Sequence, residues 1–138
     1  MINIFTCNCG NETYSFQKIL DIPLLINNNQ KEITIEALID NFLKEILVDL
    51  NDRCSKCKKI KKNIKKYIRF NILNEIIIFS IQRIDPMSST KNISNINYDK
   101  ILDLTRFTDS PYKDNNNSYK LFATIHHNGT ISYGHYYS

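Results

Sequence analysis

The chain has 138 residues, of which 42% are apolar and 23% charged, and these are ordinary values for one globular domain or a part of a larger one. Its apolar runs are too short to cross a membrane, so we expect no membrane-spanning segment. The net charge of +4 accompanies a composition rich in Asn, Ile and Lys, whose codons are rich in A and T, so the charge alone does not indicate a nucleic-acid partner.

The first residues, MINIFTCNCG, contain no basic region followed by a sustained apolar stretch. We therefore expect no secretory signal and an intracellular protein, in the cytoplasm or the nucleus, whose cysteines stay reduced. Stretches rich in β-formers lie on either side of a tight turn at residues 7–10, which predicts a hairpin that leads into an extended segment. Pro23 argues against a central strand in that segment, because proline has no N–H to donate.

The segment 35–50 has the spacing of an amphipathic helix. Thr34 is the candidate N-cap, and Glu36 places a negative charge in the first turn, where it complements the helix dipole. The apolar residues that recur at helical spacing are Ile35, Leu38, Ile39, Phe42, Leu43, Ile46, Leu47 and Leu50. The sequence therefore predicts one helix across roughly 35–50.

A second cysteine-bearing turn, at residues 53–57, leads into a basic run that ends at Phe70. The stretch EIIIFSIQRI, at 75–84, predicts a buried strand, because it is short, rich in β-branched residues and followed by an Asp-Pro pair. Beyond it we expect a loop, two short extended pieces and an exposed, mobile loop of variable length, at 86–92, 93–98, 101–107 and 110–118.

The final strand is predicted at 119–128. Alternate side chains of a strand share a face, and here these are Leu121, Ala123, Ile125 and His127. Asn128-Gly129 between two β-rich runs is a strong turn signal, so we expect this strand to pair with residues 132–138.

The cysteines form two closely spaced pairs, Cys7-x-Cys9 and Cys54-x-x-Cys57, each in a polar, turn-prone context. Two such pairs of thiolates can converge on one tetrahedral zinc ion and tie together segments that are distant in sequence. The alternatives are four free thiols or a disulfide. Because every cysteine of an intracellular chain is paired in this way, we favour one structural zinc ion.

The lysines from Lys58 to Lys66 could contact phosphate groups, and Tyr67 and Phe70 follow them. The alternative is a solvated strand face in a lysine-rich protein, which we favour. We therefore expect no specific nucleic-acid site.

The three histidines cluster near the end of the chain. On a strand, His126 faces away from His127, so the two do not form a pair of adjacent ligands, and we expect His126 to be a structural residue. His135 differs, because Gly134 before it permits a close backbone approach and Tyr136 after it can pack beside the imidazole.

Taken together, CNCG, CSKC, EIIIFSIQRI, YDKILDL, YKLFAT and HNGTISYGHYY resemble, in this order, the C-terminal half of a ubiquitin-specific protease, a cysteine-type deubiquitinase. The family's histidine box, His-x-Gly followed by Gly-His-Tyr, maps onto His127, Gly129, Gly134, His135 and Tyr136. In the family's Leu-x-Arg-Phe motif Arg83 matches, while the aromatic residue does not.

The resemblance implies an α+β fold in which papain-like palm strands, at about 71–138, adjoin a zinc-ribbon fingers region, at about 1–70. The family's nucleophile box has no counterpart in this sequence, and all four cysteines occupy the zinc positions. The Asp or Asn that orients the imidazole would follow the last residue. We therefore expect the fold to be incomplete, with the thumb and its nucleophile missing, and this chain alone to be inactive.

On this resemblance, His135 is the general base of ubiquitin hydrolysis, His127 and Tyr136 are candidates for the substrate cleft, and the zinc is structural. The implied partner is ubiquitin or a ubiquitinated protein. A non-catalytic zinc module that binds ubiquitin or another protein is the main alternative, ahead of a zinc ribbon that binds nucleic acid.

Overall fold

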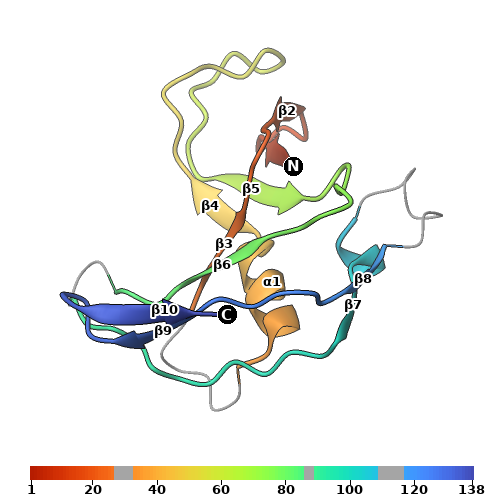
Figure 1. Cartoon of the computed structure of the whole chain (residues 1–138). Coiled ribbons are helices and arrows are strands. Elements are labelled where there is room, and N and C mark those ends of the chain that lie inside the picture. Colours follow the sequence, from red (N-terminus) through yellow and green to blue (C-terminus); the bar gives the residue numbers. More distant parts are fainter. Residues whose placement is uncertain (27–32, 86–88, 109–116) are drawn as a thin grey trace.

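The computed structural model describes residues 1–26, 33–85, 89–108 and 117–138 (Figure 1). Within these ranges most of the regular structure is strand, with one α-helix and one 3-10 helix. The elements are β1 (Ile2–Thr6), β2 (Glu12–Phe16), β3 (Ile22–Leu25), α1 (Ile35–Phe42), β4 (Ile46–Val48), β5 (Ile64–Arg69), β6 (Phe79–Gln82), β7 (Ile101–Asp103), η1 (Thr105–Phe107), β8 (Ser118–Lys120), β9 (His126–Gly129) and β10 (Gly134–Tyr137).

The largest sheet has the strand order β2-β1-β5-β4, and the neighbouring strands are antiparallel. The β1–β2 hairpin turns at the first cysteine pair, as the sequence predicts. The long loop between β4 and β5 carries the second pair and projects from the same end of the molecule, away from the β9–β10 hairpin (Figure 1).

The helix is shorter than the sequence predicts. Thr34 is the N-cap, and its Oγ1 accepts a hydrogen bond of 3.1 Å from the backbone N–H of Ala37, as expected. However, α1 ends at Phe42, and residues 46–48 form β4, which pairs with β5. The prediction of helix from 43 to 50 was wrong. Pairing with β5 stabilises a strand at 46–48, and the apolar residues there fit a short strand as well as a helix.

The hydrophobic core lies between α1, the β3–β6 pair and the segment around η1. β3 and β6 are parallel and form a two-stranded sheet, which leaves Pro23 on an edge strand. The buried side chains of the core are Ile22, Leu24, Ile33, Leu38, Ile39, Leu43, Phe70, Leu104 and Phe107. Residues from both halves of the sequence therefore share one core.

The predicted strand at 75–84 is present only as β6, and it is half-buried rather than buried. Ile76 and Ile78 precede β6 and are more than half exposed, with 61% and 54% of their surface accessible. The uninterrupted apolar run does not predict this exposure, because periodicity does not distinguish a buried strand from an exposed apolar segment.

The predicted strand at 119–128 is divided into β8 and β9, and residues 121–125 between them are mostly exposed. β9 continues through Asn128 and Gly129, so the β9–β10 turn is at residues 130–133 and not at the Asn-Gly pair. Of the two extended pieces predicted nearby, 101–107 contains β7 and η1, and 93–98 forms no strand. Most of the predicted loop at 110–118, and Pro86 to Ser88 of the loop at 86–92, lie outside the described residues.

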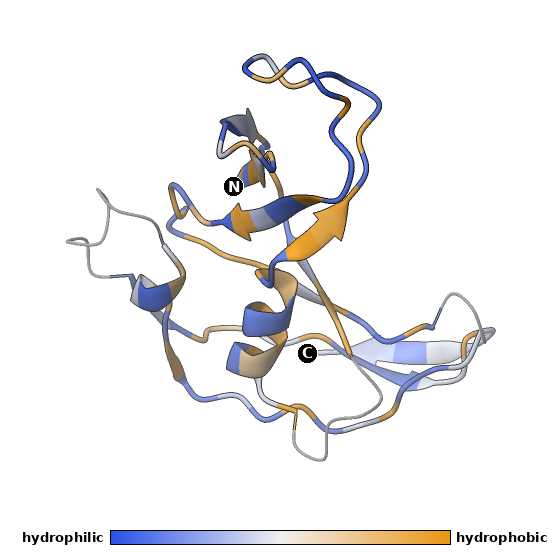
Figure 2. Ribbon diagram, turned by 180° about the vertical axis from the view of Figure 1, so that it is seen from behind, coloured by the Kyte–Doolittle hydropathy of each residue, from blue (hydrophilic) through white to orange (hydrophobic). Residues whose placement is uncertain are grey.

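Hydropathy differs between β4 and the β9–β10 hairpin. Figure 2 shows hydrophobic residues along β4, whereas the β9–β10 hairpin carries neutral and hydrophilic ones. In the part of the chain that the structure describes, no helix has the length and apolar character that crossing a bilayer requires.

Candidate functional site

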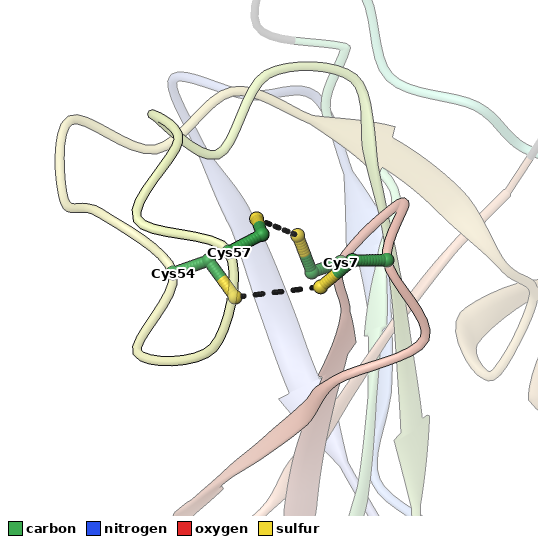
Figure 3. A group of neighbouring side chains, drawn as sticks. Cys7, Cys54 and Cys57 are labelled. Carbon is green, nitrogen blue, oxygen red and sulfur yellow. Dashed lines mark hydrogen bonds between the residues drawn. The ribbon is translucent and has the colours of Figure 1, made fainter.

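The four cysteines meet at one point, where the β1–β2 turn faces the β4–β5 loop (Figure 3). Cys7 Sγ lies 3.9 Å from Cys57 Sγ, and Cys9 Sγ lies 3.6 Å from Cys54 Sγ, while all four sulfur atoms are within 4.8 Å of one another. Four sulfurs at the usual Zn–S distance around a tetrahedral ion would be separated by about 3.8 Å. The cluster therefore fits one tetrahedral metal ion, and none of the four cysteines forms a disulfide.

Both turns place a residue with positive φ directly after their second cysteine. Gly10 follows Cys9 with a φ of 79°, and Lys58 follows Cys57 with a φ of 61°. Each turn is closed by a backbone hydrogen bond to its first cysteine, from Gly10 N–H to Cys7 O at 2.8 Å and from Lys58 N–H to Cys54 O at 2.9 Å. This left-handed step bends the backbone back so that both sulfurs of a pair point the same way.

The pKa values of the Cys54 and Cys7 thiols are shifted in opposite directions. The backbone N–H groups of Cys57 and Lys56 help lower the pKa of the Cys54 thiol to about 6, so it is a thiolate at neutral pH. For Cys7, the backbone N–H of Cys9 lowers the pKa, but burial and the neighbouring sulfurs outweigh it and raise the pKa to about 11. The cluster thus has a thiolate ready to bind a cation.

Half of the six lysines in the basic run beside the cluster pair with carboxylates. Lys61 is buried and donates to Asp52 at 2.7 Å, which helps hold the pKa of that carboxyl below its usual value. Lys62 pairs with Asp49 at 3.2 Å and Lys65 with Glu45 at 3.1 Å. Lys61 and Lys62 thus tie together the two ends of the β4–β5 loop, and the run is not a uniformly free basic strip.

The β9–β10 hairpin brings the histidine-box residues together. The register pairs His135 with Asn128, Tyr136 with His127 and Tyr137 with His126. His126 and His127 therefore face opposite ways, as predicted. The register places His135 on the same face as His126, and His127 shares the other face with Tyr136.

The two faces of the hairpin differ in packing. The His127 ring lies 4.6 Å from the Tyr136 ring, and the His126 ring stacks on Tyr137 at 5.3 Å. His135 itself is exposed. An exposed imidazole on a paired strand is placed to exchange a proton with a group that approaches from outside.

Gly134 is required by the His127 side chain. A Cβ atom at Gly134 would collide with Nε2 and Cε1 of the imidazole and with the carbonyl oxygen of Asn128. The glycine before His135 thus lets the His127 ring lie across the strand pair. The sequence predicts only that Gly134 permits a close approach. In the structure the approaching groups are the His127 ring and the Asn128 carbonyl oxygen.

Sequence reasoning missed Lys91, whose Nζ lies 2.8 Å from Nδ1 of His127. Nothing in the sequence indicates this contact, because the two residues are 36 positions apart and Lys91 lies in a segment predicted only as a loop. Arg83, the residue that matches the Leu-x-Arg-Phe motif, donates to the carbonyl oxygens of Asn92 and Ser94, at 3.1 and 2.8 Å.

Three proteins of known family are similar to the chain over almost its whole length. The probable ubiquitin carboxyl-terminal hydrolase 8 of Schizosaccharomyces pombe is 27% identical over 97% of this chain and 28% of its own length. The ubiquitin carboxyl-terminal hydrolase 17-like protein B of Mus musculus is 28% identical over 94% of this chain and 27% of its own length. Ubiquitin carboxyl-terminal hydrolase 4 of Saccharomyces cerevisiae is 28% identical over 94% of this chain and 16% of its length. The chain thus spans less than a third of these relatives.

The fold is similar to that of Ubp8 in two solved structures. One is the SAGA Ubp8/Sgf11/Sus1/Sgf73 DUB module bound to ubiquitin aldehyde, with a TM-score of 0.81 and 22% identity over 98% of this chain and 31% of that chain. The other is a Ubp8 variant in the same module bound to monoubiquitin, with a TM-score of 0.82 and 21% identity over 98% of this chain and 30% of that chain.

The family assignment rests on a match that covers almost the whole chain. The sequence model of the family described as ubiquitin carboxyl-terminal hydrolase matches residues 7–138. This range includes both cysteine pairs and the histidine hairpin. The resemblance to ubiquitin-specific proteases is thereby confirmed, and the chain belongs to the ubiquitin carboxyl-terminal hydrolase family.

Proposed function

We propose that this chain forms part of a cysteine-type deubiquitinase that hydrolyses the bond after the C-terminal glycine of ubiquitin. His135 is the general base, and the nucleophilic cysteine comes from outside these 138 residues. The observation that carries the proposal is the β9–β10 hairpin, which presents His135 on an exposed strand face within a chain of this family.

In the proposed reaction, His135 takes the proton of the cysteine thiol, and the thiolate attacks the carbonyl carbon of the glycine. The amine of the leaving group departs with that proton, and a thioester remains on the enzyme. Water then attacks the thioester, His135 again accepts the proton, and the thiol is restored as the ubiquitin carboxylate leaves. A neutral imidazole suits this role near pH 7.

Support for a substrate cleft at this hairpin comes from its exposed aromatic residues. Tyr133, Tyr136 and Tyr137 surround His135 in sequence, and between 54% and 75% of their surface is accessible. Tyrosine rings provide apolar contact area together with a hydroxyl group, as binding an extended peptide requires. Tyr136, and His127 beside it, lie on the face opposite His135, and we propose that they border the cleft from that side and give neither a chemical step.

We assign a structural zinc ion to Cys7, Cys9, Cys54 and Cys57. The sulfur separations of 3.9 and 3.6 Å support zinc over a disulfide, and a thiolate at Cys54 is the form that binds the metal. The ion would tie the β1–β2 turn to the β4–β5 loop and so complete the fingers, at about residues 1–70, while the palm occupies about 71–138. The fingers would grip the body of ubiquitin, remote from the bond that is broken.

A non-catalytic zinc module that binds ubiquitin is the second candidate. One observation favours it, which is that all four cysteines of the sequence lie in the metal cluster and none is left to act as a nucleophile. The two candidates predict different behaviour for the intact protein that contains this chain.

The test is a fluorogenic ubiquitin assay on the intact protein, with ubiquitin binding followed separately. We expect turnover, and we expect His135→Ala to lower kcat by at least about a hundredfold, since general-base catalysis contributes that much, while ubiquitin affinity changes little. His126→Ala is the matched control, because its ring already contacts Thr124 and Tyr137. Full activity of His135→Ala would contradict the catalytic role, and ubiquitin binding without any turnover would favour the second candidate.

A further inference from the structure

The Lys91 ammonium group lies among three acceptors of the β9–β10 hairpin. Its Nζ is 2.8 Å from Nδ1 of His127, 3.1 Å from the carbonyl oxygen of His127 and 2.7 Å from that of Gly129. An ammonium group has three N–H donors and no acceptor. β9 therefore supplies an acceptor for each of the three N–H donors. The Lys91 residue is half-buried.

The contact with Lys91 determines which ring nitrogen of His127 is the hydrogen-bond acceptor. Because Lys91 can only donate, Nδ1 of His127 must carry a lone pair, and the ring proton resides on Nε2. That Nε2 edge of the ring lies over Gly134, where a side chain would collide with it. The His127 ring is thus held between Lys91, Gly134 and the ring of Tyr136.

Lys91 is the polar link between the hairpin and the body of the protein. In the described part of the chain, the hydrogen bonds that join residues 126–138 to distant residues all come from this side chain. β9 and β10 form a two-stranded sheet and pair only with each other there. Isolated two-stranded hairpins are marginally stable in water, so an external anchor affects how well this one is ordered.

The anchor is itself tied to residues 83 and 84, directly after β6. Lys91 forms an isolated bridge with Ile84, and the N–H of Asn92 donates to the carbonyl oxygen of Arg83 at 2.7 Å. The Arg83 guanidinium donates back to the carbonyl oxygens of Asn92 and Ser94. The path from the core to the hairpin therefore runs through β6, the 90–94 segment and the Lys91 side chain.

From these contacts we propose that Lys91 is a positioning residue, which fixes the tautomer of His127 and the placement of the strand pair that carries His135. The kinetic part of this inference rests on the proposed function, whereas the structural part does not. Lys91 touches no reacting atom and acts only through the hairpin.

The structural arm compares the chain, labelled with 15N, with its Lys91→Met variant, which keeps a long unbranched side chain, one heavy atom shorter, and removes the donors. In the unaltered chain we expect NMR to find His127 with Nδ1 unprotonated and Nε2 protonated. In Lys91→Met we expect a mixture of tautomers and at least about tenfold faster hydrogen exchange of the β9–β10 amides. Lys100→Met is the control, because it removes the same charge from an exposed side chain.

The kinetic arm uses the intact protein. We expect Lys91→Met to lower kcat on the order of 10- to 100-fold with little change in KM, as a small misplacement of a catalytic group does, and Lys91→Arg to restore part of the loss. An unchanged tautomer and unchanged exchange in Lys91→Met would overturn the inference whatever the activity. If Lys91→Met shifts the tautomer but the unaltered intact protein shows no turnover, the positioning role is supported and the proposed function is contradicted.

Discussion

Lys58 shows how a single residue completes the cysteine cluster at a cost in free energy. It occupies the same position as Gly10, directly after the second cysteine of its pair, and both have positive φ. A side-chain-bearing residue pays roughly 1–2 kcal/mol for a left-handed conformation, whereas glycine does not. The two turns therefore share a left-handed residue after their second cysteine, but not the same local strain.

We predict that Lys58→Gly stabilises the zinc-loaded protein by up to about 1 kcal/mol, since relief of strain exceeds the extra entropy of glycine in the unfolded chain. Lys56→Gly, in the same loop but without positive φ, should destabilise it by about 0.5–1 kcal/mol. Chemical denaturation of both variants measures the difference. Destabilisation of the same size in both would show that the conformation of Lys58 carries no strain.

The pKa values within the cluster predict how zinc affinity depends on pH. Zinc binds thiolates, so protons compete with it. Cys54, with its pKa lowered to about 6, is already ionised at pH 7, whereas the Cys7 thiol, with its pKa raised to about 11, must lose its proton to the metal. Affinity should therefore fall as pH falls, and more steeply below pH 6, where about one further proton competes.

Competition with a chelator between pH 5 and pH 8 measures this change in slope. A constant slope through pH 6 would contradict the assignment of the thiolate to Cys54. Metal analysis of the same preparations should give about one zinc ion per chain, since the four sulfurs form one cluster.

At the scale of elements, the β9–β10 hairpin depends on the absence of a side chain at Gly134. We predict that Gly134→Ala destabilises the hairpin by about 2 kcal/mol, within the usual range for overpacking, because the new methyl group overlaps the His127 ring and the Asn128 carbonyl oxygen. That corresponds to about 30-fold faster amide exchange in β9 and β10, if opening is local.

A second substitution separates the two overlaps at Gly134. His127→Ala in the Gly134→Ala background removes the ring and leaves the carbonyl oxygen, so it should restore the exchange rates only in part. Complete restoration would assign the whole effect to the ring, and no restoration would contradict the packing described for this face of the hairpin.

The β4–β5 loop bears on nucleic-acid binding. Because Lys61, Lys62 and Lys65 pair with carboxylates, we predict that residues 58–66 bind DNA or RNA only weakly, with a steep loss as salt rises. Fluorescence anisotropy with unrelated oligonucleotides at 50 and about 150 mM salt is the measurement. Submicromolar, sequence-selective binding at the higher salt would instead support a zinc ribbon that reads nucleic acid.

The sequence predicts an element well when the contacts that stabilise it, or the motif that marks it, lie within a few residues of one another. The cap at Thr34 and the first hairpin follow from neighbouring residues, and both were predicted correctly. The cysteine cluster joins residues 45–50 positions apart, and it was predicted because each of its two pairs is a recognisable local motif. The end of α1 was not, because Ile46 to Val48 pair with β5, about twenty residues away. The anchor at Lys91 depends on a contact over 36 positions, which no local pattern encodes.

At the scale of the whole molecule, the chain exposes more surface than a compact monomer of its mass. Its accessible surface is 10273 Å², whereas a compact protein of 16.2 kDa exposes about 7,500 Å². Large apolar side chains are among the exposed groups, for example Phe122 at 79% and Ile125 at 78%, just before β9. Exposed apolar side chains beside β9 are what we expect if protein outside these 138 residues supplies the proposed nucleophile.

We predict that the chain by itself gives no measurable turnover of fluorogenic ubiquitin, because it supplies a base without a nucleophile. It should also bind a hydrophobic dye more strongly, per mole, than the intact protein does. Robust turnover by the chain alone would show that one of the four cysteines acts as a nucleophile and would contradict both the zinc assignment and the proposed mechanism.

The central position of β1 in the four-stranded sheet has a consequence for biosynthesis. β1 pairs with β5, and Cys7 and Cys9 meet partners that are translated some 45–50 residues later. At 5–20 residues per second, the ribosome needs roughly 2–10 s to add the 45–50 residues that separate the partner cysteines. During those seconds the nascent chain carries a dithiol without its partners, so the proposed zinc ion can be held by all four sulfurs only after the second pair has been translated.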